Sequence, residues 1–171
     1  LPIIDPVCAT LSLEEDVHYN IYFTIENFEA SLENMGLLIW NSGAPTDVTM
    51  ESAELIIPGV LWDAEGSRYK ATTDGVAAKN MADLKYIVVY AQLEDGTYLY
   101  SRVVEYSARK YAMSCLDPDS TANDETRAVC VALMNYGAEA QAYFASISDY
   151  TYETLMNAEI SADDQLRVDP Y

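Results

Sequence analysis

Apolar and polar positions alternate along the first two-thirds of the chain, with the period of two that is typical of half-buried β-strands. In the stretch 17–26 the odd-numbered residues are all apolar or aromatic, whereas the even-numbered residues are mostly polar. Two shorter β-rich runs, 36–40 and 67–73, lie next to turn-forming residues. We therefore expect a strand in each of these three segments.

The strongest local signal is a β-hairpin in the middle of the chain. Two β-rich runs, 85–93 and 97–106, are joined by Glu94-Asp95-Gly96, and an Asp-Gly turn is typical of hairpins. Several short strands with turns at this spacing predict an antiparallel β-sandwich of the immunoglobulin-like type, although the Cys-Trp-Cys pattern of antibody domains is absent.

From Ser107 onward the apolar period becomes helical. Ser107 is a suitable N-cap for a helix over 108–115, and a longer helix is predicted to begin near Asp124. Its apolar residues recur at steps of three and four, which gives a stripe that we expect to close one side of the sheet. The stripe consists of Val129, Leu133, Tyr136, Ala140, Tyr143 and Phe144.

Gly137 lies inside the long helix, which indicates a close backbone approach or a kink at this position. Beyond Tyr150 we expect a short helix around 155–158 and then a frayed end. No internal repeat or linker divides the chain, so the predicted fold class is α+β, with a single module over 1–171. It consists of a β-sandwich over about 1–106 and a C-terminal helical annex over about 107–160 packed on it.

Charge narrows the range of partners. Nine basic residues against 28 acidic residues give a net charge of −19, which repels nucleic acid and anionic membranes. No apolar run reaches the roughly 18 to 20 residues that cross a bilayer, so we expect no membrane insertion of this module. The acidity favours a soluble, solvent-exposed domain, with calcium or a basic partner as alternative explanations.

Because the chain begins at Leu1 without an initiator Met, we expect a segment of a longer protein.

Catalytic patterns are absent from the sequence. The single histidine, His18, lies on the polar side of a strand, and neither a GxSxG elbow nor a phosphate-binding glycine loop occurs. The stretch 117–125 places oxygen ligands at alternate positions, as calcium loops do, but Ala122 and Ala128 stand where such a loop needs Gly and Glu. We therefore expect no catalytic residue, no metal site and no cofactor.

The three cysteines are widely spaced and lack the CxxC pattern of zinc and redox sites. An odd number leaves at least one thiol free within a monomer. Cys115 and Cys130 flank the connection between the two predicted helices, so two interpretations stay open: a disulfide between them, or a pair of buried free thiols.

The aromatic composition is the feature of the sequence that most strongly suggests binding, because two Trp and fourteen Tyr accompany only three Phe. Trp and Tyr supply rigid contact area with a polar group at interfaces. Trp62 lies in the turn-rich stretch 58–66, Trp40 ends a strand and is expected in the core, and Tyr22 and His18 lie on a polar strand face. The candidate binding residues are therefore Trp62, Trp40, Tyr22 and His18. We expect a partner to dock before Gly66 with Trp62 as the anchor, because the helical annex should have little apolar surface free.

Three segments occur in a characteristic order: Thr-Asp-Gly-Val-Ala-Ala-Lys-Asn-Met at 73–81, Tyr-Ser-Ala-Arg-Lys-Tyr-Ala at 106–112, and Leu-Met-Asn-Tyr-Gly-Ala-Glu-Ala-Gln-Ala-Tyr-Phe at 133–144. With the trailing Leu-Met-Asn-Ala at 155–158, they resemble a module common in large secreted and cell-surface proteins of anaerobic gut Firmicutes. The resemblance covers residues 73–164. It implies a surface location and a binding or spacer role without catalytic residues.

These observations predict a non-catalytic, extracellular binding, adhesion or spacer module of a bacterial surface protein, monomeric within a larger chain. A protein partner, from the host or from a neighbouring domain, is favoured over a glycan. Host immunoglobulin is one candidate, by analogy with other surface proteins built from strings of domains. A carbohydrate-binding module is the alternative. A glycoside hydrolase fragment is more distant, because the spacing of catalytic carboxylates is a tertiary property that the sequence does not show.

Overall fold

The computed structural model describes residues 1–168 as two compact units. The first unit consists of Leu1–Gly75 and Leu84–Tyr106, and the second of Val76–Asp83 with the residues from Ser107 onward. The end of the expected frayed tail, residues 169–171, lies outside the described residues. The treatment of 1–171 as one module, with the helices packed on the sandwich, stays a prediction.

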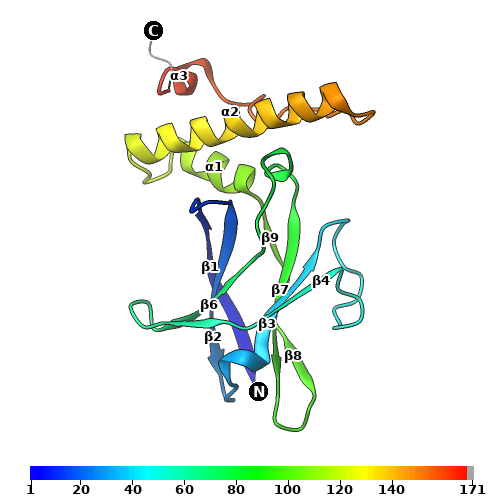
Figure 1. The fold of residues 1–171 in the computed structure, drawn as a ribbon. Coiled ribbons are helices and arrows are strands. Elements are labelled where there is room, and N and C mark those ends of the chain that lie inside the picture. The colour runs from blue at the N-terminus through cyan, green and yellow to red at the C-terminus, as the bar shows by residue number, and fades with distance from the viewer. Residues whose placement is uncertain (169–171) are drawn as a thin grey trace. The chain divides into compact units, whose positions relative to one another are not determined.

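Two antiparallel sheets make up the first unit (Figure 1). The four strands of the first sheet are, in spatial order, β1 (Ile3–Ser12), β2 (His18–Glu26), β6 (Arg68–Thr72) and β5 (Leu61–Asp63). The five strands of the second sheet are β4 (Leu55–Pro58), β3 (Met35–Trp40), β7 (Lys85–Gln92), β8 (Tyr98–Tyr100) and β9 (Val104–Tyr106), of which both β8 and β9 pair with β7. A short 3-10 helix, η1 (Leu32–Asn34), precedes β3. The α+β class and a sandwich-like pair of antiparallel sheets are confirmed, and the immunoglobulin-like subtype stays a prediction.

The three expected strands correspond to β2, β3 and β6, and the expected hairpin corresponds to β7 with β8 and β9. The second arm of the hairpin is divided at Ser101. Its N–H donates to the Val89 carbonyl and its hydroxyl accepts from the Val89 N–H, both at 2.9 Å. These bonds keep the arm attached to β7 where it leaves regular strand geometry.

Three strands lie where the sequence predicted none. Strand β1 contains Pro6, and its register shifts between Pro6 and Cys8. A bulge of this kind breaks the alternation of period two, so the strand is hidden in the sequence pattern. Strands β4 and β5 lie inside the stretch 41–66, which was expected to be irregular.

The main core of the first unit lies between its two sheets. Tyr19, Ile21 and Phe23 on β2 are fully buried, as the alternation predicted. The ring of Tyr19 meets the ring of Tyr106 on β9 edge to face, with 5.0 Å between centroids. This contact joins the two sheets directly.

The second sheet is buried on both of its faces. All six residues of β3 are buried, which explains why its sequence is a continuous apolar run without alternation. A long loop, 41–54, covers the outer face. There Val48, Met50 and Ala53 pack on a cluster of Leu38, Trp40, Val88 and Tyr90. Gly36 lies opposite Tyr90, and a Cβ at this position would collide with the Tyr90 ring and the Ile57 carbonyl oxygen.

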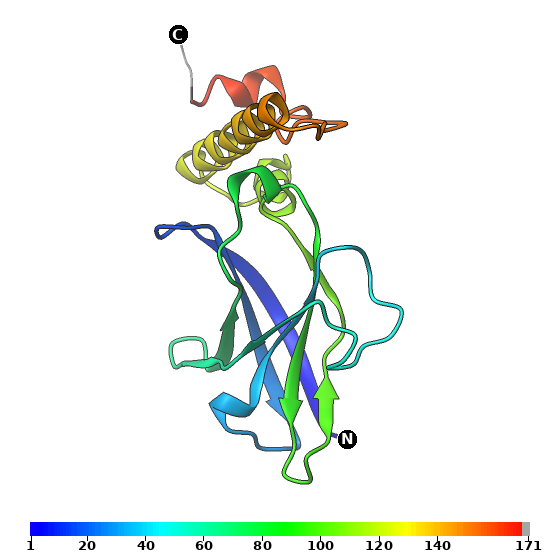
Figure 2. The ribbon, with the colours of Figure 1, turned by 45° about the vertical axis from the view of Figure 1, so that its right-hand side comes forward.

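Helices form the second unit, in which α1 and α3 lie on different sides of α2 (Figure 2). Its elements are the 3-10 helix η2 (Ala78–Asn80) and the helices α1 (Ala108–Leu116), α2 (Asp124–Ile147) and α3 (Ala162–Gln165). The expected cap is confirmed, because the Ser107 hydroxyl accepts a hydrogen bond of 3.0 Å from the Lys110 N–H. Asn123 caps α2 in the same way by accepting from the Thr126 N–H.

Helix α2 buries a different face from the one expected. Val129 and Tyr136, both placed in the buried stripe, are 52% and 58% exposed. The buried face is centred on Met134, Ala138 and Gln141, and of the expected stripe Leu133 is buried with them. The expectation of a stripe facing the core is therefore wrong for half of its members, Val129, Tyr136 and Tyr143, whereas Ala140 and Phe144 are half-buried. Apolar side chains surround most of α2, so their spacing did not identify the arc that packs.

Gly137 allows a close approach on the buried face of α2, as the sequence indicated. A Cβ here would collide with the side chains of Met156 and Met81. Met156 is fully buried, and its N–H donates to the Gln141 side-chain oxygen at 2.7 Å. The helix expected at 155–158 is wrong: this segment forms turns around Met156, and the short helix is α3, capped by the Ser161 hydroxyl.

The connection between α1 and α2 surrounds the guanidinium of Arg127. The guanidinium of Arg127 donates to the carbonyls of Leu116, Asp117, Ser120 and Ala122, at distances between 3.0 and 3.4 Å. Three of these carbonyls belong to the stretch that resembled a calcium loop. Two of the polar side chains bind the backbone of the same stretch, because Asp117 accepts from the Asp119 N–H and Ser120 accepts from the Ala122 N–H.

Cys115 on α1 and Cys130 on α2 are buried free thiols, which confirms one of the two interpretations drawn from the sequence. Burial raises the pKa of Cys130 to about 12, and the neighbouring Cys115 thiol adds to the increase. Both effects favour the neutral form of the thiol.

Candidate functional site

His18 and Tyr22, two of the four candidate residues, lie on the same polar face of β2. Between them Asn20 is buried although it is polar. Its amide donates to the Thr10 hydroxyl at 3.3 Å, and its oxygen accepts from the Thr72 hydroxyl at 2.8 Å. This ladder across β1, β2 and β6 satisfies the polar groups of the face within the sheet.

The ring of Tyr22 is covered by Arg68. The guanidinium carbon lies 4.0 Å from the ring centroid, and the same group donates to the Asp63 carboxylate at 3.0 Å. It also reaches the Cys8 sulfur at 3.2 Å. The hydrogen bond from Arg68 lowers the pKa of the Asp63 carboxyl. Because Arg68 occupies its face, Tyr22 has little ring surface left for a ligand.

His18 lines a shallow hollow of about 520 Å³ with Ser12, Glu14, Glu15 and Lys70. Its Nδ1 donates to the Thr73 carbonyl at 2.9 Å, which fixes the ring. Apart from the imidazole, the lining has no aromatic side chain on which a sugar ring could stack. The hollow therefore does not have the form of a sugar platform.

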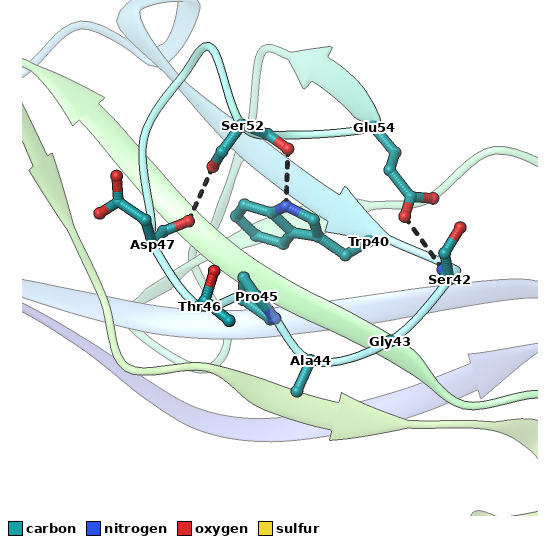
Figure 3. A pocket seen from close by; sticks show the side chains of 9 residues that line it. All are labelled: Trp40, Ser42, Gly43, Ala44, Pro45, Thr46, Asp47, Ser52 and Glu54. Atoms are coloured by element: carbon teal, nitrogen blue, oxygen red, sulfur yellow. Dashed lines mark hydrogen bonds between the residues drawn. The ribbon is translucent and has the colours of Figure 1, made fainter.

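Trp40 lies at a second hollow, of about 310 Å³, beneath the loop 41–54 (Figure 3). The indole is 5% exposed and its Nε1–H donates to the Ser52 carbonyl at 2.8 Å. Glu54 accepts from the N–H groups of Asn41 and Ser42, and these bonds lower the pKa of its carboxyl. The expected core position of Trp40 is confirmed, and its polar atom is already bonded to the loop that it anchors.

Trp62, the remaining candidate, lies on the edge strand β5 and is 51% exposed. Its ring packs edge to face against Tyr69 on β6, 4.9 Å between centroids, and Tyr69 in turn stacks on the buried Phe23 at 5.4 Å. The next residue along the edge, Leu61, is 65% exposed. Trp62 therefore continues an aromatic row from the core to the surface, whereas Leu61 points to the opposite face of the sheet.

Both ends of β5 are held in place. On one side the Gly59 N–H donates to the Met35 carbonyl at 2.7 Å, and Gly59 adopts a φ of +90°, which favours glycine. On the other side the ion pair of Asp63 and Arg68 closes the turn to β6. The exposed side chains of β5 are therefore presented by a backbone that is already ordered.

The structure does not bring the four candidates into one site. Register places Tyr22, Lys70 and Leu61 on one face of the first sheet, and Phe23, Tyr69 and Trp62 on the other. Trp40 belongs to the second sheet. Sequence reasoning missed Leu61 and the supporting Tyr69, because their placement depends on which strands become neighbours.

A pair of tyrosines on β8 was also not identified from the sequence. The rings of Tyr98 and Tyr100 are near parallel, with 15° between planes and 6.4 Å between centroids. Tyr98 is 40% exposed, whereas the Tyr100 hydroxyl accepts from the Met50 N–H at 3.1 Å. Alternate positions on a strand share one face, which is how the two rings come to lie side by side.

Within the part of the chain that the structure describes, no cluster of three or more His, Cys, Asp or Glu side chains is arranged to hold a metal ion. Nor does any helix of these residues have the length and apolar character needed to cross a bilayer. Comparison of the chain with protein-family models, curated proteins and solved structures finds no match.

Proposed function

We propose that this chain is a non-catalytic binding module of an extracellular bacterial surface protein, and that it binds a protein partner through the edge strand β5. One observation carries the proposal: Trp62 is 51% exposed on an edge strand whose backbone is fixed at both ends. Exposed Trp side chains on ordered backbones are the type of residue that dominates binding energy at protein interfaces.

The surroundings of Trp62 favour a protein over a small ligand. The hollows at His18 and Trp40 do not include Trp62, so its ring stands on an open surface. One edge of the ring is supported by Tyr69, which restricts its rotation before binding. A rigid aromatic group with little conformational entropy to lose is an effective anchor for a flat partner.

The net charge of −19 adds a condition on the partner. Long-range attraction favours proteins with a basic docking surface and makes the association rate fall as salt increases. Host immunoglobulin is one candidate to test, as is a neighbouring domain of the parent protein. An immunoglobulin-like sandwich that presents its edge strand at the cell surface is the architecture that we propose for this role.

The test is a binding screen of the full chain against host immunoglobulins and other extracellular proteins, with Trp62→Ala as the diagnostic variant. Truncation of an anchor of this type typically costs about 2 kcal/mol or more, so we expect a loss of affinity of at least about thirtyfold. Tyr98→Ala is the matched control, because it removes an exposed aromatic side chain from the same unit. Retained binding by Trp62→Ala would contradict the proposal.

Carbohydrate binding is a second candidate because of Tyr98 and Tyr100. The two rings lie near parallel on one strand, and the exposed ring of Tyr98 offers a surface on which a sugar ring could stack. A glycan array probed with the full chain distinguishes the two functions. Sugar binding that is lost in Tyr98→Ala and kept in Trp62→Ala would support this alternative over the protein-binding proposal.

A further inference from the structure

Helix α2 carries a row of large apolar side chains that contact solvent. Val129, Tyr136, Tyr143 and Ile147 are 52%, 58%, 68% and 64% exposed. We call these four residues the exposed stripe. Isolated exposed apolar residues are common on protein surfaces, but four aligned on one helix form a continuous patch.

The spacing of the exposed stripe matches helix-to-helix packing. Val129, Tyr136 and Tyr143 are separated by seven residues each, and at about 100° per residue they remain on one side of the helix. From Val129 to Ile147 the stripe extends for about 27 Å at about 1.5 Å per residue. The exposed Ala132 lies between its members and leaves room for a second backbone to approach.

The charges on this side of α2 are all negative. Glu125 and Glu139 are exposed on the same side as the stripe. The single cation of α2, Arg127, is bound to the carbonyls of the connection to α1. Arg167, which reaches α2 from the tail, is paired with Asp124 and Asp164. A partner that covers the stripe therefore meets the carboxylates of Glu125 and Glu139, whereas the cation Lys79 contacts α2 at Phe144, 3.4 Å from the ring centroid.

We propose that the exposed stripe of α2 docks an amphipathic helix of a partner protein, with Lys or Arg beside its apolar residues. Apolar contact with the stripe and attraction to Glu125 and Glu139 act together at such an interface. A second copy of this chain has the wrong charge, because each copy brings the same carboxylates and a net charge of −19. The stripe belongs to the second unit and β5 to the first, so each proposal is tested by its own variants.

The probe is a synthetic peptide about three heptads long, with Leu at the core positions and Lys at the flanking positions. A peptide of identical composition in shuffled order controls for general attraction to an acidic protein. Fluorescence anisotropy with the full chain, at low and at physiological salt, gives both affinities. We expect the heptad peptide to bind at least about tenfold more tightly than the shuffled peptide.

Three variants locate the binding surface. Tyr136→Ser combined with Tyr143→Ser should weaken heptad-peptide binding at least about tenfold, and Glu139→Lys by several-fold, most strongly at low salt. Leu166→Ser, which removes an apolar side chain that is 58% exposed elsewhere in the second unit, should have no effect. Trp62→Ala should also leave peptide binding unchanged, whatever its effect on the partner of β5.

Two results would overturn the proposal. Equal binding of the heptad and shuffled peptides, or equal binding by the stripe variant and the parent chain, would show only non-specific charge attraction. A concentration-dependent dimer in analytical ultracentrifugation, abolished by Tyr136→Ser with Tyr143→Ser, would assign the stripe to a second copy of the chain instead.

Discussion

The second sheet of the first unit and helix α2 of the second unit differ in how completely they bury their apolar residues. In the first unit the second sheet is covered on both faces, one by the first sheet and the other by the loop 41–54. In the second unit α2 buries Met134 and Ala138 on one side but leaves Tyr136 and Tyr143 in solvent on the other. The second sheet is therefore covered on both faces, whereas α2 retains an apolar surface that a partner can cover.

The difference also shows how well a pattern of apolar residues predicts which face of an element is buried. A strand has two faces, so one buried residue fixes the direction of its neighbours. A helix with apolar residues around most of its circumference has several arcs that could pack, and only the surrounding elements decide among them. In α2 the side chains of Met81 and Met156 pack against Gly137, and this contact places the Gly137 side of the helix in the core.

The sharpest test of this asymmetry compares two truncations on α2. Met134→Ala removes a fully buried side chain and should lower the free energy of unfolding by about 2 to 5 kcal/mol. Val129→Ala, on the exposed side, should change it by no more than about 0.5 kcal/mol. Urea denaturation followed by circular dichroism measures both. Equal effects would show that the assigned faces of α2 are wrong.

Removal of the Arg127 guanidinium should have the next largest effect. Arg127→Ala leaves several loop carbonyls without their donor, and we expect a loss of about 2 to 3 kcal/mol. Arg109→Ala, which breaks an ion pair with the exposed Glu159, should cost at most about 1 kcal/mol. Comparable losses in the two variants would contradict a special role for Arg127 in the helical unit.

A pair of glycine substitutions compares a rigid contact with an adaptable one. Gly36→Ala drives a methyl group into the Ile57 carbonyl and the Tyr90 ring, and should destabilise the sheet unit by about 1 to 3 kcal/mol. In Gly137→Ala the new methyl group contacts flexible methionine side chains, which can move. The higher helix propensity of Ala also offsets about 1 kcal/mol of the free-energy cost of crowding. Thermal melts should therefore separate them clearly. A larger loss for Gly137→Ala would reverse the comparison.

Alkaline pH should weaken the helical unit through Cys130. The pKa of this thiol is raised from 9.0 to about 12, so its folded state keeps the proton that the unfolded chain loses. The stabilisation is complete below pH about 9 and is lost progressively as the pH rises toward about 12. Tyr111, whose pKa burial also raises to about 12, acts in the same direction. The melting temperature of Cys130→Ala should decline less over this range, and an identical decline would count against the mechanism.

The sequence correctly predicted elements whose signals are local. The alternation in β2, the Asp-Gly turn of the hairpin and the capping hydroxyl of Ser107 each depend on residues close together in the chain. Features that depend on residues distant in the chain but close in space were not predicted. The bulge at Pro6 concealed β1, and the role of Arg127 requires carbonyls that converge only after α1 and α2 have packed.

For the candidate site the same distinction holds. The sequence favoured Trp62 over Trp40 because of its turn-rich surroundings, and the structure gives the two residues opposite exposures. It did not reveal that Arg68 covers Tyr22, because the two residues are brought together by pairing between β2 and β6. The expectation of little free apolar surface on the helices is wrong, since it depended on the incorrect face of α2.

The contrast between Trp40 and Trp62 provides two built-in optical signals. The shielded, hydrogen-bonded indole of Trp40 should emit at shorter wavelength and resist quenching by acrylamide, whereas the half-exposed indole of Trp62 should emit farther to the red and be quenched readily. A partner that docks on β5 would then shift the red component alone, and loosening of the loop 41–54 would change the blue component alone. Binding and local unfolding can thus be followed separately in unlabelled protein from its intrinsic fluorescence.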